Sequence, residues 1–266
     1  MSNQTFRGLH HGASPLLLAN AWDAGSARLI ESLGAKAIAT TSAGLAWSRG
    51  YPDGDALPAE QLLAAVREIA RVIRVPLTID IEGGYSDDPV AVAELVTRII
   101  DAGAVGINIE DGAAAPELLC AKIEAARLSA LRAGVDLFIN ARTDVYLRAI
   151  ANGDAAVSEV VRRAKSYSAA GCDGLFVPVL VDVPAIATIA AESLPLPLNI
   201  MLMPGLPSSD VLYAQGVRRL SAGSAIAQAT LGCTSRFVAG FLAGSSDAMF
   251  EASANYGAMN GLFSNR

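Results

Sequence analysis

The stretch "PVAVAELVTRIIDAGAVGINIED", residues 89–111, contains a complete structural unit and decides the fold class. Residues 89–103 carry apolar side chains at the three-to-four spacing of an amphipathic helix. Gly103 follows, at the position where a chain that leaves a helix often turns left-handed. Residues 106–111, "GINIED", form a near-continuous apolar run that ends in two acids, as in parallel strands buried on both faces. The stretch therefore predicts a helix, a glycine and a buried strand.

The same unit recurs along the chain. Seven further apolar runs predict strands at 16–22, 37–43, 76–82, 137–144, 174–179, 197–202 and 218–223. Helical patterns lie between them, as in "LPAEQLLAAVREIARVI" at 57–73, and several end at a glycine, as at Gly34, Gly134, Gly171 and Gly216. Eight strands that alternate with helices over about 250 residues predict an α/β protein with a (β/α)₈ barrel. The alternative, a doubly wound open sheet, usually has fewer strands, and no G-x-G-x-x-G follows the first strand.

The composition limits the class of protein. The chain has 266 residues, 52% hydrophobic, and a net charge of -6. We expect a single barrel domain over residues 1–244 and a C-terminal extension over 245–266. No apolar run approaches 18 residues and the first residues lack a signal-peptide pattern, so no membrane association is expected. Mild acidity without a Lys/Arg cluster argues against nucleic-acid binding.

Two further features bear on location and assembly. The three cysteines, Cys120, Cys172 and Cys233, are far apart and odd in number, which indicates buried thiols in a reducing compartment, with the cytoplasm expected. The last helix, "AIAQATLGCTSRFVAGFLAG" at 225–244, is apolar around most of its circumference. Such a helix favours burial on more than one side, so it indicates contacts between subunits.

Polar residues gather at the predicted strand ends, where a (β/α)₈ barrel places its active site. They are Thr41, Ser42, Asp80, Glu82, Glu110, Asp111, Asn140, Arg142, Asp144, Asn199 and Ser221. This distribution predicts an active site at the C-terminal end of the barrel.

The acids among them suggest a metal site. Asp80 and Glu82 are two residues apart, so on a strand they face the same side, with Glu110 on the next strand. Asp53, in a loop after the second strand, can join them. Two like charges about 4 Å apart repel by roughly 4 kcal/mol at an effective dielectric constant near 20, so either protons or a cation must compensate. Oxygen ligands without nearby His or Cys favour Mg²⁺ or Mn²⁺, whereas an acidic rim paired with surface cations is the alternative.

Substrate-binding groups are expected beside these acids. Arg142 can hold a carboxylate in bidentate fashion, and its alternative role is to pair with Asp144 or Glu110. The loop containing Thr41, Ser42, Ala43 and Gly44 offers hydroxyls and N–H groups for a second oxyanion. Tyr85 covers the site or simply packs in the core.

These motifs together resemble the isocitrate lyase/phosphoenolpyruvate mutase superfamily over about residues 15–240. The matching pieces include "PLTIDIEGGYSDDP" (76–89), "GAVGINIEDG" (103–112), "FINARTDVYL" (138–147) and "GVRRLSAGSAIAQA" (216–229). The resemblance implies a barrel whose last helix is exchanged between subunits, a homodimer or homotetramer, and Mg²⁺ or Mn²⁺ as cofactor. It implies an α-oxo carboxylate substrate and an enolate intermediate.

The resemblance also assigns roles to residues. It implies Asp80 as the direct metal ligand, with Asp53, Glu82 and Glu110 acting through metal-bound waters. Arg142, with the segment Thr41–Gly44, would bind the substrate carboxylate, and Asn199 is a further candidate for substrate binding. Asp53, Arg142 and Tyr85 are the candidate catalytic residues.

The chain departs from the superfamily pattern in its proton carriers. The Lys-Lys-Cys-Gly-His loop of the lyases is absent, because "GINIEDG" runs through three alanines directly into the next helix. Cys120 lies inside that helix and is expected to pack in the core, while His10 and His11 are expected to be solvated. Tyr51, Tyr85, a metal-bound water or one of the acids must therefore carry any proton.

Three functions follow as hypotheses. The first is a metal-dependent lyase or decarboxylase of the 2-methylisocitrate lyase or oxaloacetate decarboxylase type. The second is a P–C bond enzyme of the phosphonomutase or phosphonopyruvate hydrolase type, for which Arg49 and Asn199 are the few candidate phosphoryl contacts. The third is a protein that binds an α-oxo acid without turnover.

Overall fold

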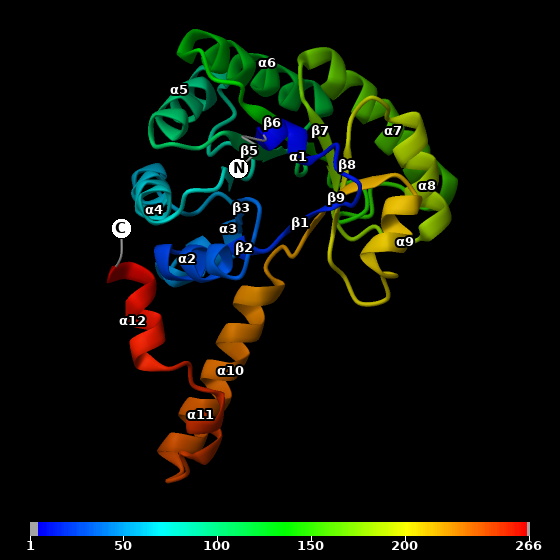
Figure 1. The fold of residues 1–266 in the computed structure, drawn as a ribbon. Helices are drawn as coiled ribbons and strands as arrows, with labels where there is room; N and C mark the ends of the chain where they lie inside the picture. The colour runs from blue at the N-terminus through cyan, green and yellow to red at the C-terminus, as the bar shows by residue number, and fades with distance from the viewer. Residues whose placement is uncertain (1–4, 265–266) are drawn as a thin grey trace.

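All strands of the computed structural model, which describes residues 5–264, are parallel and form one nearly closed barrel (Figure 1). In chain order they are β1 (Leu16–Leu18), β2 (Asn20–Ala21), β3 (Ile38–Thr40), β4 (Leu77–Asp80), β5 (Gly106–Glu110), β6 (Phe138–Arg142), β7 (Gly174–Val177), β8 (Leu198–Met201) and β9 (Val217–Ser221). The sheet order is β1-β9-β8-β7-β6-β5-β4-β3-β2. Because β1 and β2 are two pieces of one predicted strand, the sheet has eight barrel positions, and the predicted (β/α)₈ fold is confirmed.

Each strand ends one to three residues before its predicted end, and three differences change the local structure. The first predicted strand is interrupted at Ala19. The second ends at Thr40, because Ser42–Ser48 form a helix. The third ends at Asp80, since Glu82 has a left-handed backbone with φ of 51° that cannot continue a strand. The second and third differences fall on predicted site residues, so the site is less regular than a set of strand ends.

Helices surround the barrel and extend beyond it. They are α1 (Phe6–Leu9), α2 (Ala24–Ser32), α3 (Ser42–Ser48), α4 (Ala59–Val72), α5 (Pro89–Asp101), α6 (Pro116–Ala133), α7 (Gly153–Ala170), α8 (Val183–Glu192), α9 (Ser209–Ala214), α10 (Ala225–Leu242), α11 (Asp247–Ala252) and α12 (Tyr256–Ser264). Local signals fix several ends: Asp88 caps α5 through the N–H of Val90, and Gly134 ends α6 in a left-handed conformation. The predicted stripe of α4, including Leu62, Val66 and Ile69, is fully buried.

The N-terminal helix α1 closes the end of the barrel opposite the predicted site. Phe6 is buried there with Phe138, and the His10 ring stacks on Phe138 at a centroid distance of 4.1 Å. His10 is 1% exposed, so the expectation that it is solvated was wrong, whereas His11 is exposed as expected. Burial, with the nearby charge of Arg219, lowers the pKa of His10 to about 3. The sequence shows α1 as a short segment before the first strand and gives no sign that it folds back under the barrel.

The C-terminal helices leave the barrel as an arm, drawn in orange to red in Figure 1. Only Ala227 of α10 is buried, and α12 returns to α2, where Arg28 Nε donates to the Leu262 carbonyl at 2.9 Å. The predicted domain division at residue 244 remains a prediction. Cys172 is buried as predicted, and Cys120 is partly buried and packs against the core. Cys233 is also only partly buried, so the prediction of a buried thiol was wrong there. Within residues 5–264, the helices are too short or too polar for a transmembrane span.

Candidate active site

Asp80, Glu110 and Arg142 end three neighbouring strands at the C-terminal end of the barrel. Asp80 is the last residue of β4, Glu110 of β5 and Arg142 of β6. The register aligns Glu110 with Arg142 directly, and Asp80 with Asn108, two residues before Glu110. The Asp80 N–H donates to Thr40 Oγ1 at 2.9 Å, which fixes the end of β4 against β3. The predicted convergence of these three residues is therefore present in the fold.

Asp80 lies where several charges meet. Its pKa is raised, first by burial and further by the negative charge of Asp53, while Arg142 opposes the rise. Asp53 itself is exposed in the loop before α4, yet its charge also raises the pKa of Glu82. Asp80 Oδ1 accepts the N–H of Glu82 at 3.2 Å. The charges of Asp53, Asp80 and Glu82 thus act on one another.

Glu82 reaches this group from a turn and not from a strand. Its carboxylate accepts the N–H of Gly54 at 2.8 Å, a short hydrogen bond from the N–H of Asp55, and the hydroxyl of Tyr85 at 3.1 Å. The prediction that Asp80 and Glu82 share one strand face was wrong, because the strand stops before residue 82. Burial raises the pKa of Glu82 to about 7, with the neighbouring acids adding to the effect. Glu82 therefore joins the loop at 53–55 to the loop at 82–85.

Backbone strain is concentrated in these two loops. Asp55, Glu82 and Tyr85 all have positive φ, at 56°, 51° and 59°. The Tyr85 N–H donates to Asp55 Oδ1 at 3.2 Å, so the three strained residues contact one another. Such conformations cost about 1–3 kcal/mol each and cluster at functional sites. Burial and Glu82 also raise the pKa of Tyr85 well above its usual range, so its hydroxyl keeps its proton.

Arg142 is held between two acids. Its Nε and Nη2 donate to the Asp144 carboxylate at 2.7 and 3.1 Å, and its Nη1 lies 2.6 Å from Glu110 Oε2. The Glu110 contact is an ion pair without the alignment of a hydrogen bond. Both pairings considered as alternatives for Arg142 are therefore present. Burial raises the pKa of Glu110 above its ordinary value while Arg142 lowers it, and the two acids keep Arg142 protonated by raising its pKa.

The segment with Thr41 and Ser42 has a different local structure from the one predicted. Residues 42–48 form α3, with Thr41 at its N-cap, so the interpretation of this segment as an open loop was wrong. Thr41, Ser42, Ala43 and Gly44 are all buried. A Cβ on Gly44 would lie 2.8 Å from Thr41 Cγ2 and 2.8 Å from Trp22 Cβ. Gly44 therefore allows close packing of α3 beside Trp22.

Asn199 lies in the interior of the barrel and not at its end. It is aligned with Arg219 on β9, and both side chains are fully buried. Arg219 Nη2 donates to Asn108 Oδ1 at 3.0 Å, whereas its Nε and Nη1 and both Asn199 amide atoms have no partner among the described residues. Burial lowers the pKa of Arg219 to about 9, and Asp80 opposes this. Sequence reasoning missed Arg219, because the sequence "VRRLS" at 217–221 puts an arginine on each face of the strand. The structure shows that Val217, Arg219 and Ser221 form the buried face.

The carboxylates do not form a closed metal cage. Among residues 5–264, no group of three or more His, Cys, Asp or Glu is arranged to hold a metal ion directly. Glu82 accepts two N–H groups of the 53–55 loop and the Tyr85 hydroxyl, and Glu110 pairs with Arg142. Among the described residues, the Asp80 carboxylate accepts one hydrogen bond, from the N–H of Glu82. One carboxylate that contacts the ion, with further acids at longer range, fits a hydrated hard cation. Mg²⁺ usually binds in this form, because it keeps several of its waters. Only residues 111–115 connect β5 to α6, which matches the predicted absence of a long lid.

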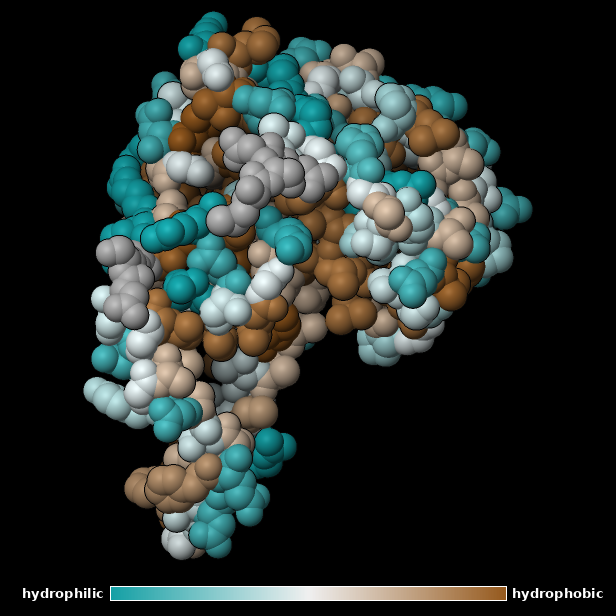
Figure 2. All heavy atoms as spheres, in the orientation of Figure 1, coloured by the Kyte–Doolittle hydropathy of each residue, from teal (hydrophilic) through white to brown (hydrophobic). Residues whose placement is uncertain are grey.

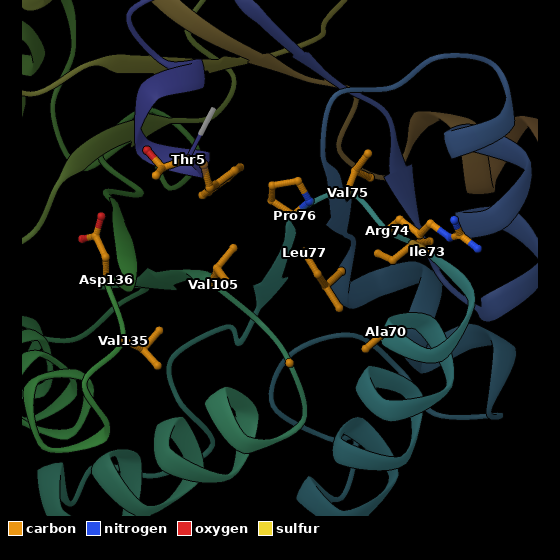
Figure 3. A pocket seen from close by; sticks show the side chains of 12 residues that line it. Thr5, Ala70, Ile73, Arg74, Val75, Pro76, Leu77, Val105, Val135 and Asp136 are labelled. Carbon is orange, nitrogen blue, oxygen red and sulfur yellow. The ribbon is translucent and has the colours of Figure 1, made fainter. Parts of the chain in front are cut away.

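A pocket of about 560 Å³ lies at the opposite end of the barrel (Figure 3). Val75, Pro76, Leu77, Val105 and Val135 line it, at the N-terminal ends of β4, β5 and β6. It is therefore separate from the candidate active site.

Comparisons with known proteins show the family and agree with the fold. A family model described as phosphoenolpyruvate phosphomutase matches residues 6–242. An uncharacterized protein of Mycobacterium tuberculosis strain H37Rv, Rv1998c, is 38% identical over 222 residues, which is 83% of this chain and 82% of that protein. The 2-methylisocitrate lyase of Salmonella typhimurium is 31% identical over 67% of this chain and 63% of the lyase. An oxaloacetate decarboxylase of Rhodopseudomonas palustris is 30% identical over 84% of this chain and 79% of the decarboxylase.

Solved structures share the architecture. A Burkholderia cenocepacia protein provisionally described as a phosphonomutase has a TM-score of 0.84 and 40% identity over 88% of this chain and 97% of that chain. A phosphonopyruvate hydrolase solved with oxalate and Mg²⁺ has a TM-score of 0.84 at 23% identity, covering 98% of this chain and 94% of that chain, and so supports the fold alone.

Proposed function

Because the chain belongs to the phosphoenolpyruvate phosphomutase family, a family with lyase and mutase relatives, we propose that it is a divalent-cation-dependent enzyme that cleaves a C–C bond next to an α-oxo carboxylate. The reaction is of the 2-methylisocitrate lyase or oxaloacetate decarboxylase type. Relatives with both descriptions are about 30% identical to this chain. The proposed substrate is a small α-oxo acid, or a 2-hydroxy acid adduct whose cleavage releases one.

The observation that carries this proposal is that Arg142 and Asp80 end strands at the same end of the barrel, with β5 between them. Arg142 is 16% exposed, and its guanidinium is oriented by Asp144 and Glu110. A guanidinium fixed in this way binds a substrate carboxylate with little loss of its own freedom. Asp80 ends the strand two positions away in the sheet. In this proposal Arg142 holds the carboxylate, and Asp80 holds the cation at the adjacent oxo group.

The chemistry of the proposed reaction follows from these positions. A bound Mg²⁺ or Mn²⁺ supplies the positive charge that polarises the oxo group and stabilises an enolate. Asp80 is the proposed direct ligand, with Asp53, Glu82 and Glu110 holding the ion's waters. The segment Thr41–Gly44 and Asn199 remain proposed substrate contacts. Tyr85 keeps its proton and donates a hydrogen bond to Glu82. Asp53, Arg142 and Tyr85 are the proposed catalytic residues.

A product assay tests the proposal. Pyruvate release from oxaloacetate and from 2-methylisocitrate is followed in about 5 mM Mg²⁺. This concentration saturates a Mg²⁺ site with a dissociation constant up to about 1 mM. We expect turnover of at least one compound that is abolished by chelator and by Asp80→Asn. Cation binding without turnover of either compound would contradict the lyase proposal and favour an α-oxo acid-binding protein.

Cleavage of a P–C bond is the second candidate. The Burkholderia relative provisionally described as a phosphonomutase, at 40% identity, favours it. Against it, Arg49 turns away to Leu45, Ser48 and Glu68, so it is not free for a phosphoryl group. Incubation with phosphonopyruvate, followed by phosphorus NMR, separates the two: a new phosphate or phosphoenolpyruvate signal would support P–C chemistry.

We further propose that the active form is a homo-oligomer in which α10 packs on a second copy. The helix exposes Leu231, Val238, Phe241 and Leu242. An apolar groove of about 680 Å³, lined by β1, α2 and Ile226, lies beside its base, and Figure 2 shows hydrophobic surface there. Light scattering should show a dimer or tetramer that Phe241→Glu dissociates, while Leu128→Glu, an equally exposed site on α6, leaves it intact.

A further inference from the structure

Asp111, the residue after Glu110, is buried beneath the segment that follows Arg142. Its side chain is fully buried, and its contacts reach both sides of Thr143. The Asp111 N–H donates to the Arg142 carbonyl at 3.2 Å. Asp111 Oδ1 accepts the N–H of Asp144 at 2.8 Å. One residue therefore holds the backbone immediately before and after Thr143.

The second carboxylate oxygen anchors Asp111 to α7. Asp111 Oδ2 accepts Arg163 Nη1 at 2.7 Å and the Tyr167 hydroxyl at 2.6 Å. Arg163 Nε in turn donates to Glu159 Oε1 at 2.6 Å. Arg163 is 6% exposed, so this ion pair lies out of water, where such contacts are most directional. One oxygen of the Asp111 carboxylate is thus fixed by α7, while the other contacts the Asp144 backbone.

We propose that Asp111 is a positioning residue for Arg142: it fixes the Asp144 backbone, and the Asp144 carboxylate then sets the plane of the Arg142 guanidinium. The inference rests on the proposed function, in which Arg142 binds the substrate carboxylate. Asp144 is fully buried and accepts Nε and Nη2 of Arg142, so a shift of its backbone moves both contacts. Residues behind a ligand-binding side chain typically change affinity by about 10- to 100-fold when they are replaced.

The opposite end of β6 offers a matched control. Asp173 also accepts a backbone N–H, that of Ile139 at 2.7 Å, and pairs with Arg127 and Arg7. It is 13% exposed, and its hydrogen bonds and ion pairs within residues 5–264 do not include Arg142 or Asp144. Asp173→Ala therefore removes a comparable ion-pair cluster without touching the candidate site.

The test is calorimetric titration of the full chain with oxalate in saturating Mg²⁺, together with a separate titration with Mg²⁺ alone. Asp111→Ala should weaken oxalate binding by about tenfold while Mg²⁺ affinity changes by less than about twofold, in line with an effect through Arg142. Asp173→Ala should lower the melting temperature but leave oxalate affinity within about twofold of the wild type. A purely structural role for Asp111 would lower the melting temperature without moving oxalate affinity.

Asp111→Asn covers the case in which Asp111→Ala does not fold. Its single amide oxygen is drawn to the charged Arg163, so the Asp144 N–H loses its acceptor and oxalate binding should weaken severalfold. The inference is overturned if a folded Asp111 variant binds oxalate within about twofold of the wild-type affinity. It is also overturned if Mg²⁺ affinity falls as much as oxalate affinity, because the effect would then act through Glu110. Wild-type protein that fails to bind oxalate with Mg²⁺ overturns the proposed function and this inference with it.

Discussion

Replacing Glu82 by glutamine tests the electrostatic account of the two strained loops. The Glu82 carboxylate accepts the N–H groups of Gly54 and Asp55 and the hydroxyl of Tyr85, and the residue is 4% exposed. Burial raises its pKa from an ordinary value of 4.5 to about 7. A glutamine at this position keeps the size of the side chain and removes its titration, so the variant isolates the energy of one buried charge.

The magnitude follows from the pKa. At about 1.36 kcal/mol per pKa unit, the difference between the pKa values of 4.5 and about 7 corresponds to roughly 3 kcal/mol of unfolding free energy. Screening by solvent at the loop surface reduces this contribution to roughly 2–3 kcal/mol. The folded-state pKa lies above the unfolded one, so the folded state binds the proton more tightly. The stabilisation is complete below about pH 4.5 and is lost as the pH rises through 7. The unfolding free energy of Glu82→Gln, relative to that of the wild type, should therefore rise by roughly 2–3 kcal/mol between pH 4.5 and pH 8.

Urea unfolding measured by tryptophan fluorescence in chelator, at several pH values from 4.5 to 8, gives the required difference. Glu159→Gln is the control, because its hydrogen bond to Arg162 lowers the pKa of Glu159 to about 2. The difference in unfolding free energy between Glu159→Gln and the wild type should stay constant above about pH 4.5. It should change only at lower pH, where the wild type loses the stability that the Glu159 charge provides. A Glu82→Gln difference that stays constant within about 0.5 kcal/mol from pH 4.5 to 8 would refute the reasoning.

Three further predictions concern binding and packing. Arg142→Lys replaces the paired Nε and Nη2 contacts to Asp144 by one ammonium, so oxalate affinity measured by calorimetry should fall at least about tenfold, and unfolding free energy by about 1.5–3 kcal/mol. Gly44→Ala places a Cβ 2.8 Å from Thr41 and Trp22 atoms, so urea unfolding should show about 1–3 kcal/mol of destabilisation, and an unchanged midpoint would contradict the packing described. Apparent Mg²⁺ affinity in calorimetry should rise from pH 6 to 8.5, because Glu82, with its pKa near 7, and Glu110, near 8, must lose protons to attract the ion; a flat profile would contradict their participation.

The barrel was predictable because its signals are local and repeated. Each buried parallel strand leaves an apolar run, and helix ends such as Gly134 and Gly171 need a left-handed residue. The strand ends also placed Asp80, Glu110 and Arg142 together, since parallel strands of one barrel finish at the same end.

What the sequence did not show depends on contacts between distant segments. Glu82 leaves the strand because its carboxylate binds backbone groups 27 and 28 residues away, at Asp55 and Gly54. His10 is buried because α1 folds under the barrel onto Phe138. Arg219 points into the barrel, where the negative charge of Asp80 favours its protonated form. Only the register of β9 with its neighbours reveals that direction.

A crystal structure of the protein with Mg²⁺ and oxalate tests the central claim most directly, because it locates the ion and the anion together. We expect one ion about 2.0–2.1 Å from an Asp80 carboxylate oxygen, with waters directed to Glu82 and Glu110, and oxalate between that ion and the Arg142 guanidinium. An ion bound away from Asp80, or oxalate bound without contact to Arg142, would contradict the account.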